Sequence, residues 1–216
     1  MSTTEPIAVE FQDLLRQTRL VPVITIHDVE AAIGLATALR DGGLPVLEVT
    51  LRTYAGLACI ERIAKEVPDV VVGAGTVLTA HQYRDARDAG AEFIVSPGCT
   101  DQLLRAAASE GGAFLPGAVT ATEVMRMLDA DISLLKFFPA ESSGGIAAVK
   151  ALGGPFPQVT FCPTGGIDLA RAQDYLALPN VACVGGSWMV PQSLIERGDW
   201  AQITRLAGEA TSTLRG

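Results

Sequence analysis

Gly43–Glu66, GLPVLEVTLRTYAGLACIERIAKE, contains the unit from which most of this chain is built. An aliphatic run over Val46–Thr50 is followed by a short polar turn and then by an amphipathic segment of helical length. A short apolar run bounded by turn residues is typical of a buried strand, and apolar residues three and four positions apart are typical of a helix. The stretch therefore predicts one strand followed by one helix.

The same pattern recurs along the sequence. Strands are expected at Val21–Ile26, Val46–Thr50, Val70–Ala74, Phe93–Ser96, Ala113–Pro116, Leu134–Phe137, Thr160–Pro163 and Val181–Gly185. Helices are expected to begin near Val29, Tyr54, Ala80, Asp101, Ala121, Ile146 and Leu169, with a last helix over Trp200–Leu214. Parallel neighbours need helical crossovers, and eight strand–helix units close naturally into a barrel.

We therefore expect an α/β fold, a (β/α)8 TIM barrel, with a doubly wound open sheet as the alternative architecture. No linker, low-complexity tract or shift of composition divides the 216 residues, so a single barrel domain over residues 1–216 is predicted. Val9–Arg19 has the pattern of an extra amphipathic N-terminal helix, which we expect to cover the bottom of the barrel.

Cap and turn residues support these boundaries. Thr79 is followed three residues later by Gln82, and Thr120 by Glu123, which is the spacing of a capping box. Asp168 directly precedes an expected helix and is a suitable N-cap. Glycines, which favour the left-handed conformation at a helix C-terminus, follow helical stretches at Gly42-Gly43, Gly90 and Gly111-Gly112.

The composition argues against several classes of protein. Hydrophobic residues make up 49% of the chain and charged residues only 19%, which favours a globular protein with a large core. The net charge of -8 and the pI near 4.7 argue against a nucleic acid or an anionic membrane as partner. Because no apolar run is long enough to span a bilayer and no signal-peptide pattern is found, we expect a cytoplasmic protein. Four cysteines without C-x-x-C spacing and two histidines give little support for a zinc site.

One lysine occupies an unusual place. Of the three lysines, Lys65 and Lys150 fall late in helical stretches, where solvated cations are expected. Lys136 instead lies inside an expected strand, between two leucines and two phenylalanines. Burial penalises an ammonium group, and a neutral amine is what nucleophilic attack on a carbonyl requires. Lys136 is thus a candidate nucleophile; the alternative is a structural lysine paired with a core carboxylate.

A second strand carries an acid and a base on one face. Glu48, Thr50 and Arg52 alternate with aliphatic residues, so they share one side of the strand. If that side faces the barrel interior, Glu48 can act as a general acid/base beside Lys136, and Arg52 can bind a carboxylate through two parallel hydrogen bonds. The alternative is an ion pair between Glu48 and Arg52 without a catalytic role.

Glycine-rich turns follow the last two expected strands, at Pro163–Asp168 and Val184–Trp188. The phosphate site of a TIM barrel is usually found there, because glycine lets backbone N–H groups approach a phosphate and a helix N-terminus adds a favourable dipole. Ser187 can add a hydroxyl, and Thr76, after the third strand, offers another donor at the barrel mouth. Each glycine pair taken alone also fits a plain tight turn.

Two of these segments resemble the signature regions of the 2-keto-3-deoxy-6-phosphogluconate (KDPG) / 4-hydroxy-2-oxoglutarate aldolase family. The matching strings are Glu48-Val49-Thr50-Leu51-Arg52 and Lys136-Phe137-Phe138-Pro139-Ala140. Further segments look like that family's in the same order, at Gly73–Thr76, Ser96–Gly98, Pro163–Ile167 and Gly185–Pro191, so the resemblance spans nearly the whole chain. One departure is Asp131, which stands in a turn where the second signature normally has glycine.

The resemblance implies a class I aldolase that cleaves a phosphorylated 2-keto acid through a lysine imine, without a metal or other cofactor, and that is usually a homotrimer. By position in the family's pattern, Lys136 would form the imine and Glu48 would be the general acid/base. Arg52 and Thr76 would bind the substrate carboxylate. The other matching residues would line the pocket (Pro97 and Phe138), border the substrate hydroxyls (Thr164) and hold the phosphate (Gly165, Gly166, Gly186 and Ser187).

Other functions remain open from the sequence. A phosphosugar isomerase or decarboxylase on the same barrel would share the phosphate turns but would not need a lysine that forms an imine. A metal-dependent aldolase would lose activity in a chelator. A non-catalytic barrel would bind a phosphorylated metabolite without turnover.

Overall fold

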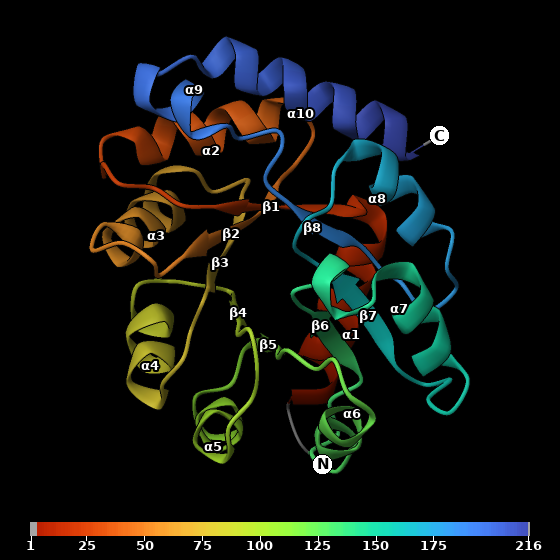
Figure 1. Ribbon diagram of the computed structural model, residues 1–216. Helices are drawn as coiled ribbons and strands as arrows, with labels where there is room; N and C mark the ends of the chain where they lie inside the picture. The colour runs from red at the N-terminus through yellow and green to blue at the C-terminus, as the bar shows by residue number, and fades with distance from the viewer. Residues whose placement is uncertain (1–3, 216) are drawn as a thin grey trace.

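The computed structural model describes residues 4–215, in which parallel strands form an inner wall and helices surround them (Figure 1). The strands are β1 (Leu20–Ile24), β2 (Val46–Thr50), β3 (Val71–Gly75), β4 (Phe93–Val95), β5 (Ala113–Leu115), β6 (Leu134–Phe137), β7 (Thr160–Pro163) and β8 (Val184–Gly186). The helices are α1 (Thr4–Thr18), α2 (Ala31–Asp41), α3 (Gly56–Glu66), α4 (Ala80–Asp88), α5 (Asp101–Glu110), α6 (Ala121–Leu128), α7 (Gly145–Gly153), α8 (Leu169–Leu176), α9 (Gln192–Arg197) and α10 (Trp200–Arg215), with a 3-10 turn, η1, at Glu141–Ser143. Within residues 4–215, no helix combines the length and apolar composition needed to cross a membrane.

The barrel closes from two hydrogen-bonded sections. Six strands pair in the order β5-β4-β3-β2-β1-β8, and β6 pairs with β7. Single parallel bridges join Gly117 to Lys136 on one side of the two-stranded section and Phe161 to Val181 on the other. Every strand therefore has a neighbour on both sides, which confirms the predicted barrel and excludes the open sheet.

Strand alternation separates two hydrophobic clusters. Along β2, Leu47 and Val49 belong to the large cluster that lies between the strands and the surrounding helices. Val46, on the other face of the same strand, belongs to a smaller cluster inside the barrel. Glu48 and Thr50 share the face of Val46, so the alternation directs them into the interior.

The N-terminal helix closes the bottom of the barrel, as predicted. Phe11 and Leu15 of α1 are buried in the interior cluster, and the ring centroids of Phe11 and Phe93 lie 4.8 Å apart. Gln12 and Arg16 donate side-chain hydrogen bonds to the hydroxyl of Thr160, at the start of β7. The helix begins earlier than the predicted Val9 and ends at Thr18 rather than Arg19.

The eighth strand corrects one prediction. The sequence predicts Val181–Gly185, whereas β8 covers Val184–Gly186. Isolated bridges join Phe161 to Val181 and Thr164 to Gly185, so the β8 side of the ladder holds one extra residue between them. That extra residue interrupts regular pairing, as a bulge does, so that the strand begins at Val184 instead of Val181.

The other boundaries agree with prediction to within about two residues, apart from one helix that was not predicted. This helix, α9, has only six residues, too few to show a helical period in the sequence. The predicted cap at Asp168 and the capping box at Thr120 also form: Asp168 accepts from the Arg171 N–H, and Thr120 and Glu123 bond reciprocally. At Thr79 the box is half complete, because the Gln82 side chain bonds the Leu78 N–H instead.

Asp131 keeps the turn that glycine normally makes. Its φ of 58° lies in the left-handed region, where aspartate is tolerated better than most non-glycine residues. The N–H of Asp131 donates to Leu128 and the N–H of Ile132 donates to Met127, each at 3.0 Å, which is the Schellman pattern. The departure from the family's pattern thus leaves the backbone conformation intact, at the bottom of the barrel and away from the candidate site.

Candidate active site

A buried ion pair lies in the barrel interior. Lys136 on β6 and Glu48 on β2 are each 3% exposed. The Lys136 Nζ donates to both carboxylate oxygens, at 2.9 Å to Oε1 and 3.2 Å to Oε2. It also lies 5.4 Å from the centroid of the Phe138 ring. Removing two charges from water costs several kcal/mol each, and their pairing offsets this cost. Pairing alone fits a structural lysine as well as a nucleophile, so the surroundings of the pair distinguish the two.

Glycines on β3 make room for this pair. Gly73 and Gly75 lie beside Glu48 and Thr50, respectively, in the register of β2 and β3. A Cβ added at Gly75 would lie only 2.2 Å from the Glu48 Oε1. A side chain at this position would therefore displace the carboxylate from Lys136, so glycine is required for the observed geometry.

Two thiols lie inside the same part of the barrel. Cys162 is opposite Lys136 in the β6–β7 register and lies next to Cys183; both thiols are buried. The Cys183 thiol is the main cause of a lowered pKa at Cys162, against the effect of burial, and Lys136 lowers it further. The Cys162 thiol, followed by burial, raises the pKa of Cys183 well above its ordinary value. The lysine thus faces polarisable side chains rather than a tightly packed aliphatic layer.

Arg52 and Thr76 meet at the mouth of the barrel. The Arg52 Nε donates to the Thr76 Oγ1 at 3.0 Å, and Arg52 remains exposed. Thr76 has a φ of 59°, a left-handed conformation that a β-branched residue rarely adopts. Such backbone strain costs about 1–3 kcal/mol and persists where the surrounding structure imposes it. The strained threonine holds the guanidinium at the rim.

A pocket of about 120 Å³ joins most of the predicted binding residues. Its wall consists of Val23, Arg52, Phe138, Thr164, Gly165, Gly166, Ile167, Gly185, Gly186 and Ser187. Both glycine-rich turns therefore line the same cavity as Arg52. The ring of Phe138 connects the wall to the buried amine of Lys136.

The glycines of these turns satisfy both packing and backbone geometry. Gly165 and Gly166 have φ of 104° and 77°, and Gly186 leaves space for the Trp188 ring, which lies 1.9 Å from the position of an added Cβ. Among residues 4–215, the N–H groups of Gly165, Gly166 and Ser187 find no backbone acceptor. Free N–H groups on an accessible turn are suited to an anion.

The remaining sequence candidates do not line this pocket. Pro97 is half-buried after β4, but it is not part of the wall of the pocket. His27 is exposed, and His81 lies on the surface beside Asp85. Lys65 is likewise exposed and pairs with Glu61.

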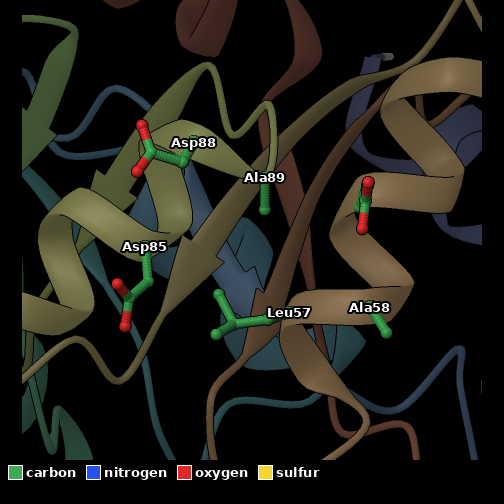
Figure 2. Close-up of a pocket in the computed structure, with 6 residues that line it drawn as sticks. Leu57, Ala58, Asp85, Asp88 and Ala89 are labelled. Atoms are coloured by element: carbon green, nitrogen blue, oxygen red, sulfur yellow. The ribbon is translucent and has the colours of Figure 1, made fainter.

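A wider groove lies on the outside of the barrel, between α3 and α4. Figure 2 shows Leu57 of α3 pointing toward α4, which carries Asp85 and Asp88. The lining is completed by Ala58, Glu61 and Ala89. Two of the three carboxylates already have partners, since Lys65 bonds Glu61 and His81 lies near Asp85. The groove contains no nucleophile or cation for an anionic substrate, so we place the site in the smaller pocket.

Sequence reasoning missed Gly75, the thiol pair and the role of Glu141, described below. A weak signal existed for Gly75, because glycines at alternate positions of one strand, 73 and 75, indicate a close approach on one face. Within residues 4–215, no group of three histidine, cysteine, aspartate or glutamate side chains is arranged to hold a metal ion.

Comparison with known proteins gives a consistent result. Residues 11–206 match the family model described as KDPG and KHG aldolase. The chain is 51% identical to the 2-dehydro-3-deoxy-phosphogluconate aldolase of Pseudoalteromonas atlantica, over 96% of this chain and 97% of that protein. It is 49% identical to the KHG/KDPG aldolase of Escherichia coli K12, over 92% of this chain and 93% of that protein.

A solved structure is similar to this protein over nearly the whole chain. It is the KDPG aldolase from Legionella pneumophila, with pyruvate captured as a covalent carbinolamine intermediate. The TM-score is 0.90 at 45% identity, and the match covers 92% of this chain and 97% of that one.

Proposed function

The chain belongs to the KDPG and KHG aldolase family, and we propose that it cleaves 2-keto-3-deoxy-6-phosphogluconate to pyruvate and glyceraldehyde 3-phosphate through an imine on Lys136. The observation that carries this assignment is the contact of the Lys136 amine with Glu48, buried next to a pocket that combines an arginine with two glycine-rich turns. A structural ion pair would not need that pocket.

The chemistry begins at the lysine. The neutral Lys136 amine adds to the C2 carbonyl of the keto acid, and loss of water from the carbinolamine gives a protonated imine. Glu48, 2.9 Å from the amine, accepts the ammonium proton and returns it to the departing hydroxyl.

Carbon–carbon cleavage uses the imine as an electron sink. Glu48, directly or through a water molecule, removes the proton of the C4 hydroxyl, and the electrons of the C3–C4 bond move to the imine nitrogen. Glyceraldehyde 3-phosphate leaves, Glu48 protonates the resulting enamine at C3, and hydrolysis releases pyruvate.

Both anionic ends of the substrate have complementary groups. Arg52, held by Thr76, binds the carboxylate, and the turns at Gly165, Gly166, Gly186 and Ser187 bind the phosphate through backbone N–H groups and one hydroxyl. Pro97, Phe138 and Thr164 border the chain of carbon atoms between them. Fixing both ends orients the reacting bond beside Lys136 and lowers the entropy cost of reaction.

We further propose that no metal or other cofactor takes part, because the imine itself accepts the electrons. Full activity in excess EDTA is expected, and loss of activity there would favour a metal-dependent aldolase. By family resemblance, we also propose a cytoplasmic homotrimer, for which light scattering should give three times the chain mass of 22.6 kDa.

The test is pyruvate release, coupled to lactate dehydrogenase, from the phosphorylated substrate and from 4-hydroxy-2-oxoglutarate. The parent should cleave the first, and we propose the second as a slower substrate because of the E. coli relative. Ser187→Ala should lower kcat/KM by about 10-fold for the phosphorylated compound alone, since it removes one hydrogen bond to a charged group.

Ser212→Ala, an exposed serine on α10, serves as the matched control and should match the parent on both compounds. No pyruvate from either compound would refute the proposed function. An equal loss on both after Ser187→Ala would refute the assignment of this turn to the phosphate.

A further inference from the structure

The loop that follows β6, the strand that carries Lys136, is hydrogen-bonded to the first glycine-rich turn. The N–H of Ala140 donates to the carbonyl of Thr164 at 2.8 Å, and the N–H of Glu141 donates to the carbonyl of Gly165 at 3.2 Å. An added Cβ at Gly166 would lie 2.9 Å from the Glu141 Cγ. The backbone of the turn at Gly166 therefore packs directly against the Cβ and Cγ atoms of Glu141.

The carboxylate of Glu141 is held from the other direction by α8. The Tyr175 hydroxyl donates to its Oε1 at 2.7 Å, and the Arg171 guanidinium pairs with its Oε2. Burial and then the hydrogen bond to Glu141 raise the pKa of Tyr175, so the hydroxyl keeps its proton and donates. Arg171 lies in the first turn of α8, and its N–H donates to Asp168, the last residue of the glycine-rich turn.

We propose that Glu141 is a positioning residue for the phosphate end of the site, which rests on the function proposed above. Glu141 connects three parts: the loop carrying Phe138 beyond Lys136, the turn at Gly165-Gly166, and the first turn of α8. It thereby fixes the distance between the imine nitrogen and the N–H groups that receive the phosphate. A substrate without a phosphate makes no use of those N–H groups, so Glu141 acts as a determinant of specificity.

The ion pair between Glu141 and Arg171 differs from an ordinary surface ion pair. Arg205 and Glu209 pair one turn apart on α10, with side chains that are 55% and 53% exposed. The Glu141 side chain is less exposed, at 30%, carries a second hydrogen bond from a buried tyrosine, and touches a glycine of the turn. Arg205→Gln therefore offers a control that breaks an ion pair on α10, on the outside of the barrel and away from the site.

The experiment measures kcat/KM for the phosphorylated keto acid and for 4-hydroxy-2-oxoglutarate with the parent and with Glu141→Ala. The ratio of the two values should fall by about 10-fold in Glu141→Ala, mainly through a higher KM for the phosphorylated compound, because displacement of a binding group by a fraction of an ångström weakens a fixed geometry. Glu141→Gln keeps the length of the side chain and an acceptor for Tyr175, and should lower the ratio by only about 3-fold.

Arg205→Gln should leave the ratio at the parental value. A Glu141→Ala protein that loses activity on both substrates equally, or that retains the parental ratio, would overturn the proposal. If Glu141→Ala does not fold, Glu141→Gln gives the same decision, since a parental ratio in that variant contradicts a positioning role. A parent that releases no pyruvate from either compound instead refutes the proposed function and, with it, this inference.

Discussion

The two halves of the barrel interior bury different kinds of side chain. At the bottom, Phe11 and Leu15 of α1 pack against Phe93 and other apolar residues at the starts of the strands. Toward the mouth, interior positions hold Glu48 and Lys136, together with hydroxyls and thiols. A buried aliphatic side chain contributes about 1.5–3 kcal/mol to stability, whereas a buried ion pair is often no more stabilising than apolar groups of equal volume. The apolar side chains of the bottom half therefore stabilise the fold. The charged side chains of the upper half are instead accounted for by the proposed reaction.

The largest effect should come from the upper half. Lys136→Ala should lower kcat/KM for the phosphorylated keto acid by at least about 10⁴-fold, because the covalent intermediate is lost. Pyruvate release in the lactate dehydrogenase assay measures this change.

A measurement of the free energy of unfolding distinguishes a variant that has lost only the reaction from one that has lost its fold. Replacing both partners, with Lys136→Met and Glu48→Leu, should also abolish activity while keeping the free energy of unfolding within about 2 kcal/mol of the parent. Urea unfolding measures it, and a much larger loss of stability would show that the pair supports the fold.

The bottom half should respond in the opposite way. Leu15→Ala should lower the free energy of unfolding by about 2–5 kcal/mol, since Leu15 is fully buried and leaves a cavity. Well below Tm, kcat should stay at the parental value. Leu14→Ala, on the same helix but half-buried, is the control and should cost less; equal losses for the two would contradict the packing described for α1.

A smaller effect is expected where glycine makes room for the ion pair. Gly75→Ala places a Cβ against the Glu48 carboxylate and should lower kcat by about 10²-fold. Gly208→Ala, where an added Cβ meets no atom within 4 Å, should leave kcat unchanged. Parental kcat in Gly75→Ala would mean that the position of the carboxylate does not limit the reaction.

The smallest effect concerns the turn at Asp131, outside both halves. Asp131→Gly should raise the free energy of unfolding by about 0.5 kcal/mol, because glycine adopts a φ of 58° without steric strain. Chemical denaturation checks it, and a loss of stability would show that the aspartate side chain itself stabilises the turn.

The sequence was sufficient for the barrel and for singling out Glu48 and Lys136, because both follow from local patterns, but it left open which partner the carboxylate takes. Strand alternation placed Glu48 on one face, and Lys136 was conspicuous as a charge inside an apolar strand. Alternation also predicted that Glu48 and Arg52 share a strand face, but the lysine rather than the arginine pairs with the carboxylate.

What the sequence could not give are contacts between distant segments. Glu141 and Arg171 are 30 residues apart, and no local pattern joins them. The extra residue in β8 and the contact between Gly75 and Glu48 likewise depend on the register of neighbouring strands, which is set only when the barrel closes.

The most direct test of the account is to trap the imine. The protein is incubated with pyruvate and sodium borohydride, digested, and mapped by mass spectrometry. With only three lysines in the chain, the map is simple to read. The account predicts one pyruvate-derived adduct, on Lys136. Absence of an adduct, or its appearance on Lys65 or Lys150 instead, would contradict it.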